Sequence, residues 1–144
     1  MVISADTSFL FSLYGTDVFT PEAEAKLRDL DAPITLSRFG EFELANALRL
    51  AEFRILRTPE DTAKSLASFG NDVSTGQIEL PACNLADVVS TARRLSIDHT
   101  AIGGHRGFDI LLVAFALEIG ASKFLTFDKN QMALAVAEGL TVLE

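Results

Sequence analysis

Short apolar segments alternate with longer helical segments along the whole of this 144-residue chain. Proline or glycine stands at most of the boundaries between them, where these residues interrupt regular structure. The apolar segments predict buried strands at residues 2–5, 34–36, 78–80, 123–126 and 140–143. The longer segments predict helices at residues 8–14, 21–27, 38–56, 60–71, 85–97, 105–119 and 129–138, with a loop at 98–104.

This alternation is typical of one fold class. Strands that alternate with helices form an α/β structure, in which a short, mainly parallel sheet is flanked by helices on both faces. No linker or low-complexity stretch interrupts the pattern, so we expect a single domain spanning residues 1–144. The single cysteine, Cys83, has no partner for an internal disulfide. With no signal peptide or membrane-spanning run in view, we expect a cytoplasmic protein.

The charge balance excludes one class of function and permits another. The net charge is −8, which argues against a protein that coats nucleic acid passively, because such proteins are basic. It argues less against a nuclease, since metal-binding acids add negative charge that bound divalent ions cancel locally. Most of the acids need no explanation beyond solubility.

Four acids stand where predicted elements begin or end. Asp6 and Asp128 each follow a predicted strand, and Glu43 and Asp109 lie in the early turns of predicted helices. The carboxyl ends of parallel strands meet at one edge of a sheet, so all four can meet there. Clustered carboxylates repel one another unless a cation joins them, and oxygen ligands favour Mg²⁺ or Mn²⁺. A cation of this kind can activate a water against a phosphodiester.

The segments around these acids carry a resemblance to a known family. They are ADTS at residues 5–8, FELANAL at 42–48, RGFDILLVA at 106–114 and FLTFDKNQ at 124–131. In this order and spacing, the chain resembles the PIN-domain ribonucleases, specifically the VapC toxins of type II toxin–antitoxin pairs. The likeness covers essentially the whole chain.

The resemblance implies a three-layer PIN-like fold and a metal-dependent endoribonuclease. It implies that Mg²⁺ or Mn²⁺ is held by Asp6, Glu43, Asp109 and Asp128, and that the products carry 5′-phosphate and 3′-hydroxyl ends. It also implies two partners, an RNA substrate and a cognate antitoxin protein that fills the acidic groove with a basic side chain.

Auxiliary roles fall to residues beside the four acids. Thr126, and Thr7 or Ser8, would position a carboxylate or a water by hydrogen bonding. Asn46 lies three residues after Glu43 on the same helix face, where it can orient that carboxylate or touch substrate. Arg106 can contact phosphate or pair with an acid.

Simpler readings of the same acids stay open. Asp6 and Asp128 can each cap the helix that follows, and Asp109 can be a first-turn acid that favours the helix dipole. Glu41 competes with Glu43 for the place in the site, but Glu43 is preferred, because it is flanked by Phe42, Leu44 and Ala47 and matches the family position. The fold can also serve as a catalytically inactive RNA- or protein-binding module. A phosphoacceptor signalling domain uses strand-end acids too, but it needs a lysine near the end of a later strand.

One apolar stretch predicts a contact between proteins. The run from residue 44 to 53 exceeds what one small core needs, so we expect a homodimer or an antitoxin interface there. Arg49, Arg54 and Arg57 follow along the same segment. They can track an RNA backbone, or they can simply form a solvated face.

Overall fold

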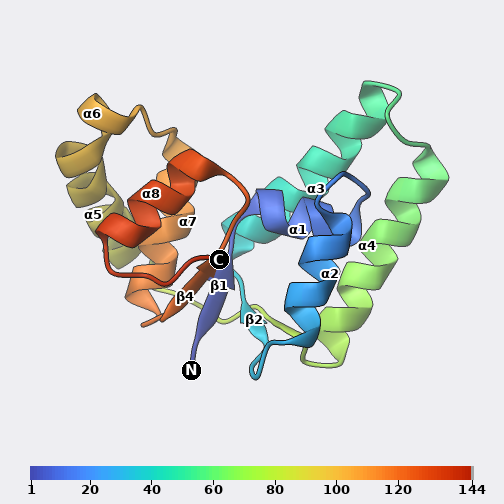
Figure 1. Ribbon diagram of the computed structural model, residues 1–144, viewed down its shortest axis with the longest axis horizontal. Helices are drawn as coiled ribbons and strands as arrows, with labels where there is room; N and C mark the ends of the chain where they lie inside the picture. Colours follow the sequence, from blue (N-terminus) through green and yellow to red (C-terminus); the bar gives the residue numbers. More distant parts are fainter. Residues whose placement is uncertain (144) are drawn as a thin grey trace.

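A parallel sheet lies between two groups of helices in the computed structural model, which describes residues 1–143 (Figure 1). The strands stand in the order β3-β2-β1-β4, and every pair is parallel. Their bounds are Ile3–Ala5 for β1, Ile34–Thr35 for β2, Ile78–Glu79 for β3 and Lys123–Leu125 for β4. The predicted α/β class is therefore confirmed.

Two hydrophobic clusters fill the space on either side of the sheet. The first joins the sheet to α1 (Thr7–Tyr14), α2 (Thr20–Arg28), α3 (Arg38–Phe53) and α4 (Pro59–Ser74). The second joins it to α5 (Leu85–Leu95), α7 (Gly107–Glu118) and α8 (Lys129–Ala137). In β4, Phe124 belongs to the second cluster and Leu125 to the first, as expected when successive side chains point to opposite faces. The sheet and the groups of helices packed on its two sides therefore form three layers.

Side-chain caps fix where several helices begin. In each case a side-chain oxygen accepts a hydrogen bond from a backbone N–H of the first turn, which otherwise has no partner in the helix. The capping residues are Asp6 for α1, Ser37 for α3, Thr58 for α4, Asn84 for α5 and Asp128 for α8. Two of the four acids singled out in the sequence are therefore helix caps.

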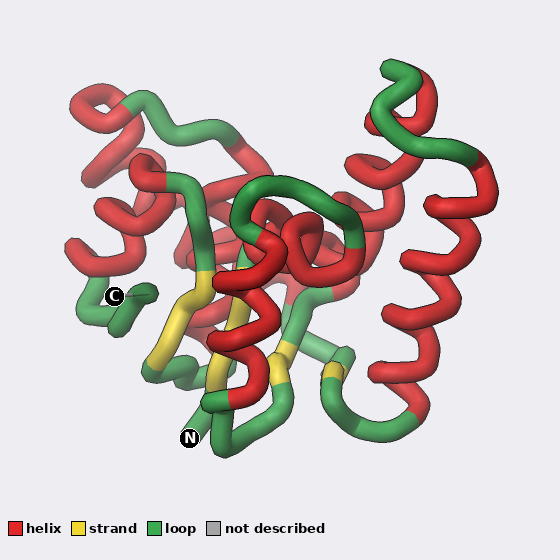
Figure 2. Tube along the Cα trace, turned by 45° about the vertical axis from the view of Figure 1, so that its right-hand side comes forward, coloured by secondary structure: helices red, strands yellow, loops and turns green. Residues whose placement is uncertain are grey.

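The topology changes direction beside β1. The chain leaves β1 toward β2 and β3 on one side, then returns to place β4 on the other side of β1. Figure 2 shows these short strands between the much longer helices. Sites in open parallel sheets form at the carboxyl ends of the strands where such a change occurs. Asp6 directly follows β1, and Asp128 comes shortly after β4.

Residues 98–103 of the segment predicted as a loop, 98–104, are helical, so that prediction was wrong for all but Gly104. Helix α5 continues into a π-helical turn, η1 (Ser96–Thr100), and a short helix, α6 (Ala101–Gly103). Glu138, just after α8, accepts hydrogen bonds from Arg94 at 2.8 Å and pairs with His99 at 2.9 Å. These contacts across 44 and 39 residues stabilise the helical path, and the local sequence does not reveal them.

The start of α7 and the last predicted strand also differ from the prediction. Helix α7 begins at Gly107 and not at His105, because Gly104 is left-handed with φ +69° and Arg106 is extended. The segment predicted as a strand at 140–143 makes a single bridge, Thr141 to Lys123, beside β4. Among the described residues, no helix has the length and hydropathy needed to cross a membrane.

The turn after α3 contains a strained residue, Ile55. Ile55 has φ +60° and is 91% exposed, directly after the C-cap of α3. A β-branched residue is costly in this conformation, which glycine adopts freely. We expect Ile55→Gly to raise the free energy of unfolding by about 1 kcal/mol in a denaturant titration.

Ile102 is the matched control for this prediction. It is 92% exposed, but it lies in α6 and is not among the residues with positive φ. There the same change to glycine should lower stability, because glycine loses more conformational freedom in a helix. Destabilisation by both substitutions would contradict the account of strain at Ile55.

Candidate functional site

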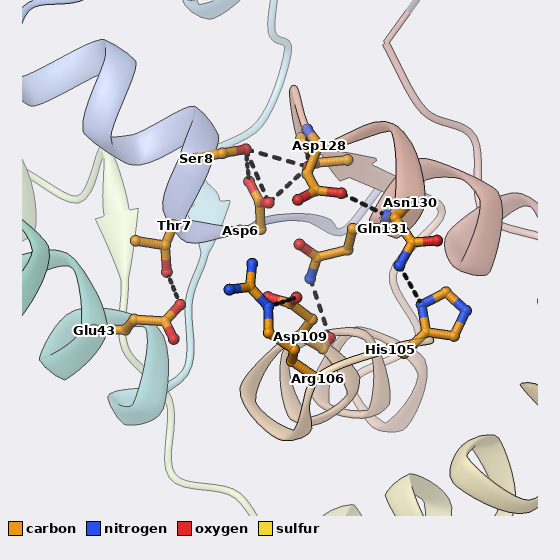
Figure 3. Close-up of polar contacts among 11 residues, drawn as sticks. Asp6, Thr7, Ser8, Glu43, His105, Arg106, Asp109, Asp128, Asn130 and Gln131 are labelled. Atoms are coloured by element: carbon orange, nitrogen blue, oxygen red, sulfur yellow. Dashed lines mark hydrogen bonds and ion pairs between the residues drawn. The ribbon is translucent and has the colours of Figure 1, made fainter. Parts of the chain in front are cut away.

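A groove of about 630 Å³ opens at the carboxyl ends of β1 and β4. It is lined by the starts of α1, α7 and α8 and by one side of α3. Asp6, Glu43, Asp109 and Asp128 all lie on its walls. The structure therefore brings together four acids that are up to 122 residues apart in the sequence (Figure 3).

Asp6 is the most firmly held of the four. It is 3% exposed, and its carboxylate accepts hydrogen bonds from the Thr126 hydroxyl at 2.6 Å and the Phe9 backbone N–H at 3.0 Å. The Ser8 hydroxyl lies within 2.9 Å of both carboxylate oxygens. This fixed position follows from the strands, because the backbone N–H of Asp6 also donates to the Leu125 carbonyl at 3.0 Å.

Burial makes the ionised form of Asp6 expensive. Loss of hydration raises the pKa of this carboxyl from its ordinary 3.8 to about 6. The hydrogen bonds from Thr126, Phe9 and Ser8 oppose that rise, and the nearby charge of Asp128 adds to it. The fold thus holds a carboxylate in a place where water stabilises it poorly.

Asp109 and Asp128 belong to the same electrostatic group. Burial raises the pKa of Asp109, the Arg106 guanidinium opposes that rise, and the charge of Asp128 reinforces it. Arg106 Nε stands 3.5 Å from the Asp109 carboxylate. Asp128 is fixed by its capping bond to the Gln131 N–H at 2.9 Å. Its own backbone N–H donates to the Thr126 hydroxyl at 3.0 Å.

The choice between Glu41 and Glu43 has a geometric answer. Glu43 lines the groove and accepts a hydrogen bond from the Thr7 hydroxyl. Glu41 is not among the lining residues and pairs with Arg38 at 3.1 Å on the exposed side of α3. The location within the groove therefore favours Glu43 as the fourth acid of the site.

The auxiliary residues divide into two groups. Thr7, Asn46 and Arg106 line the groove itself. Thr126 is fully buried and reaches the groove only through its bonds to Asp6 and the Asp128 backbone. Ser8 also lines the groove, and it accepts a hydrogen bond from the Phe127 N–H at 3.0 Å. This links the loop after β4 to the start of α1.

Gln131 is a residue of this groove to which the sequence motifs assign no role. It lies in the first turn of α8, lines the groove and is 2% exposed. Its side-chain amide donates to the Asp109 carbonyl at 3.1 Å, so it joins the starts of α7 and α8. Its position three residues after a capping acid fits a helix start, but that pattern predicts neither the bond to Asp109 nor a place in the groove.

The donor set fits a hard divalent cation, although its side chains are not gathered around one point. All four acids offer carboxylate oxygens, which Mg²⁺ and Mn²⁺ prefer. Within residues 1–143, no three acidic, histidine or cysteine side chains lie close enough together to hold one ion. Thr7 holds Glu43, and Arg106 pairs with Asp109. Binding would require at least one of these side chains to turn toward the others.

Several solved structures share this fold. VapC20 of Mycobacterium tuberculosis, described as a toxin that cleaves the sarcin–ricin loop, superposes with a TM-score of 0.70. It is 18% identical, over 91% of this chain and 93% of its own. VapBC2 of Rickettsia felis, solved bound to a DNA fragment from its promoter, superposes with a TM-score of 0.68. It is 14% identical, over 99% of this chain and 98% of its own. FitAcB of Neisseria gonorrhoeae superposes with a TM-score of 0.65. It is 16% identical, over 99% of this chain and 97% of its own.

These likenesses show that the chain has the fold of VapC-type PIN domains. The fold that the sequence resemblance implied is therefore confirmed. No protein-family model and no curated protein sequence matches the chain. At these sequence identities the solved structures show the fold alone. Any chemistry has to be inferred from the residues of the groove.

The raised pKa of Asp6 predicts a pH effect on stability. An acid whose pKa is higher in the folded state makes folding less favourable as pH rises from 3.8 through about 6. Without divalent cations, we expect wild type to gain about 2 kcal/mol relative to Asp6→Asn between pH 7 and pH 4. Urea titrations at both pH values measure this difference. If the free energy of unfolding changes with pH in the same way for both proteins, burial does not raise the pKa of Asp6.

Proposed function

We propose that this chain, which has the fold of VapC-type PIN domains, is a divalent-metal-dependent endoribonuclease and the toxin of a toxin–antitoxin pair. The observation that carries the proposal is one groove lined by Asp6, Glu43, Asp109 and Asp128. The four carboxylates would hold Mg²⁺ or Mn²⁺. The cation would supply an activated water and charge stabilisation for phosphodiester hydrolysis, with 5′-phosphate and 3′-hydroxyl products.

The residues around the acids have defined tasks in this proposal. Thr126 and Ser8 donate hydrogen bonds to Asp6 and so fix the direction of its oxygens. Thr7 does the same for Glu43. Arg106 has an 84% exposed side chain at the rim, where its guanidinium can bind a phosphate of the RNA backbone. Asn46, exposed on the α3 wall, is available to the substrate.

A second surface is available to the proposed protein partners. A second cavity of about 540 Å³ lies between α1, α3 and α4, with Phe11, Ala51 and Leu56 as its apolar wall. Beside it, Phe53 and Ile55 are 83% and 91% exposed. Exposed apolar patches of this kind mark protein contacts. We assign this region to the antitoxin or to a second copy of the chain, and we expect the protein to act in the cytoplasm.

An inactive binding module is the second candidate, and one observation favours it. Glu43 is held by Thr7 and Asp109 by Arg106, and in the described part of the chain no three acids gather around a point. Such a module would still bind RNA in gel-shift assays, but it would release no product with either Mg²⁺ or Mn²⁺. Metal-dependent product formation would exclude it.

Cleavage of RNA tests the proposal. Wild type should cut a mixed single-stranded RNA with Mg²⁺ or Mn²⁺ and should stop when EDTA is added. Asp6→Asn and Asp109→Asn should each lower the rate of RNA cleavage about 100-fold or more, because each removes a charge from the cation site. Gel electrophoresis of labelled RNA measures the rates. Equal cleavage by all three proteins, or cleavage that survives EDTA, would refute the mechanism.

The two glutamates of α3 provide a matched pair of variants. Glu43→Gln should reduce cleavage about 100-fold, since Glu43 faces the groove. Glu41→Gln removes the same charge from the same helix, but on the side that faces Arg38, and should stay within about twofold of wild type. Initial rates at saturating Mn²⁺ make the comparison. A larger loss at Glu41 would reverse the assignment.

A further inference from the structure

Gln131 is a buried polar side chain that the proposed chemistry has not yet used. It is the third residue of α8, and Asp128 accepts a hydrogen bond from its backbone N–H at 2.9 Å. The residue as a whole is only 2% exposed, yet it contributes to the lining of the acidic groove. Its backbone is thus fixed beside one acid of the groove, and what remains exposed of it faces the groove.

The hydrogen bond to α7 sets the direction of the amide. Gln131 Nε2 donates to the Asp109 backbone carbonyl at 3.1 Å. A carbonyl oxygen only accepts, so the nitrogen must face Asp109 and the amide oxygen must face the other way. In Figure 3 this oxygen points into the space bordered by Asp6, Glu43 and Asp109. Among the described residues, no hydrogen bond reaches Gln131 Oε1.

The groove itself offers this oxygen few donors. Ionised carboxylates only accept hydrogen bonds, so the four acids cannot supply one. The hydroxyls of Thr7 and Ser8 donate to Glu43 and Asp6, and the Arg106 guanidinium pairs with Asp109. Within residues 1–143, this oxygen is not among the buried side-chain atoms left without a partner, so it stays open to the groove and can accept a hydrogen bond from a donor that arrives with the substrate.

We propose that the side-chain carbonyl of Gln131 accepts a hydrogen bond from an O–H group held in the groove. Two O–H donors enter a ribonuclease site, the water that attacks the phosphodiester and a ribose 2′-hydroxyl. Both offer the same chemistry to the amide oxygen. The inference rests on the proposed endoribonuclease function and adds to it a residue that touches the reacting groups.

Gln131→Met tests this role, because methionine keeps the length and packing of the side chain and removes the amide. We expect kcat/KM for RNA to fall about tenfold, the value of one lost hydrogen bond in the transition state. Mn²⁺ affinity, measured by calorimetry, should stay within about twofold of wild type. A purely structural role would instead displace Asp109 and weaken cation binding along with cleavage.

A second substrate distinguishes the two donors. On an oligonucleotide with a single 2′-deoxy sugar at the scissile position, the ratio of wild-type to variant rates should persist if the donor is water. It should fall to about one if the donor is the 2′-hydroxyl. Both outcomes support an O–H donor. Gln131→Asn, which withdraws the oxygen by one methylene, provides the same test if the methionine variant does not fold.

Gln77→Met is the matched control, because Gln77 is exposed and lies before β3, outside the groove. It should cleave RNA like wild type. The inference is overturned if a folded Gln131 variant keeps the wild-type kcat/KM, or if its loss is matched by an equal loss of Mn²⁺ affinity. Absence of cleavage by wild type itself would instead refute the proposed function, so the two failures are distinguishable.

Discussion

The pairing of β1 with β4 is the constraint on which the groove depends. The two strands run parallel, with Ala5 opposite Leu125, so the residues that follow them emerge side by side. The Thr126 hydroxyl can therefore donate to Asp6 at 2.6 Å across 120 residues of sequence. Asp6 directly follows β1, Asp128 follows β4 after two residues, and each caps a helix, which fixes both acids at one edge of the sheet.

Capping and the proposed cation binding use the same side chains without conflict. Asp6 and Asp128 each accept a backbone N–H through Oδ1. Carboxylates have several lone pairs, so each retains capacity toward the groove. Burial, reinforced by the charge of Asp128, raises the pKa of Asp6 and Asp109, which is the cost of holding ionised acids here. A bound cation would remove much of that cost, which is the physical link between the fold and the proposed chemistry.

Much of the fold was predictable, because periodicity and capping residues are local signals. The parallel sheet and the helix starts at Asp6, Ser37 and Asn84 follow from patterns of a few residues. The helical path through residues 98–103 was not predictable, because Glu138 stabilises it from a distant part of the chain. The single bridge at Thr141 was likewise read as a full strand, since an apolar run does not reveal how many residues pair.

That Asp6, Glu43, Asp109 and Asp128 share one groove could be predicted from the sequence, but the contacts around them could not. The positions of the four acids at the ends of predicted elements indicated a shared edge, and the match of residues 42–48 to the family motif favoured Glu43 over Glu41. Only the folded helix shows that Glu43 lines the groove while Glu41 pairs with Arg38. The role of Gln131 depends on a bond to the Asp109 backbone, which no motif around either residue encodes. Side chains that join two helices become visible only when the helices are placed.

The proposed chemistry requires the four carboxylates of the groove to form one divalent cation site. Calorimetric titration of the metal-free protein with Mn²⁺ at pH 7 measures whether they do. We expect saturable binding that Asp6→Asn and Asp109→Asn each weaken at least about tenfold, while Glu41→Gln leaves it unchanged. Binding that is absent in wild type, or equal in all four proteins, would contradict it.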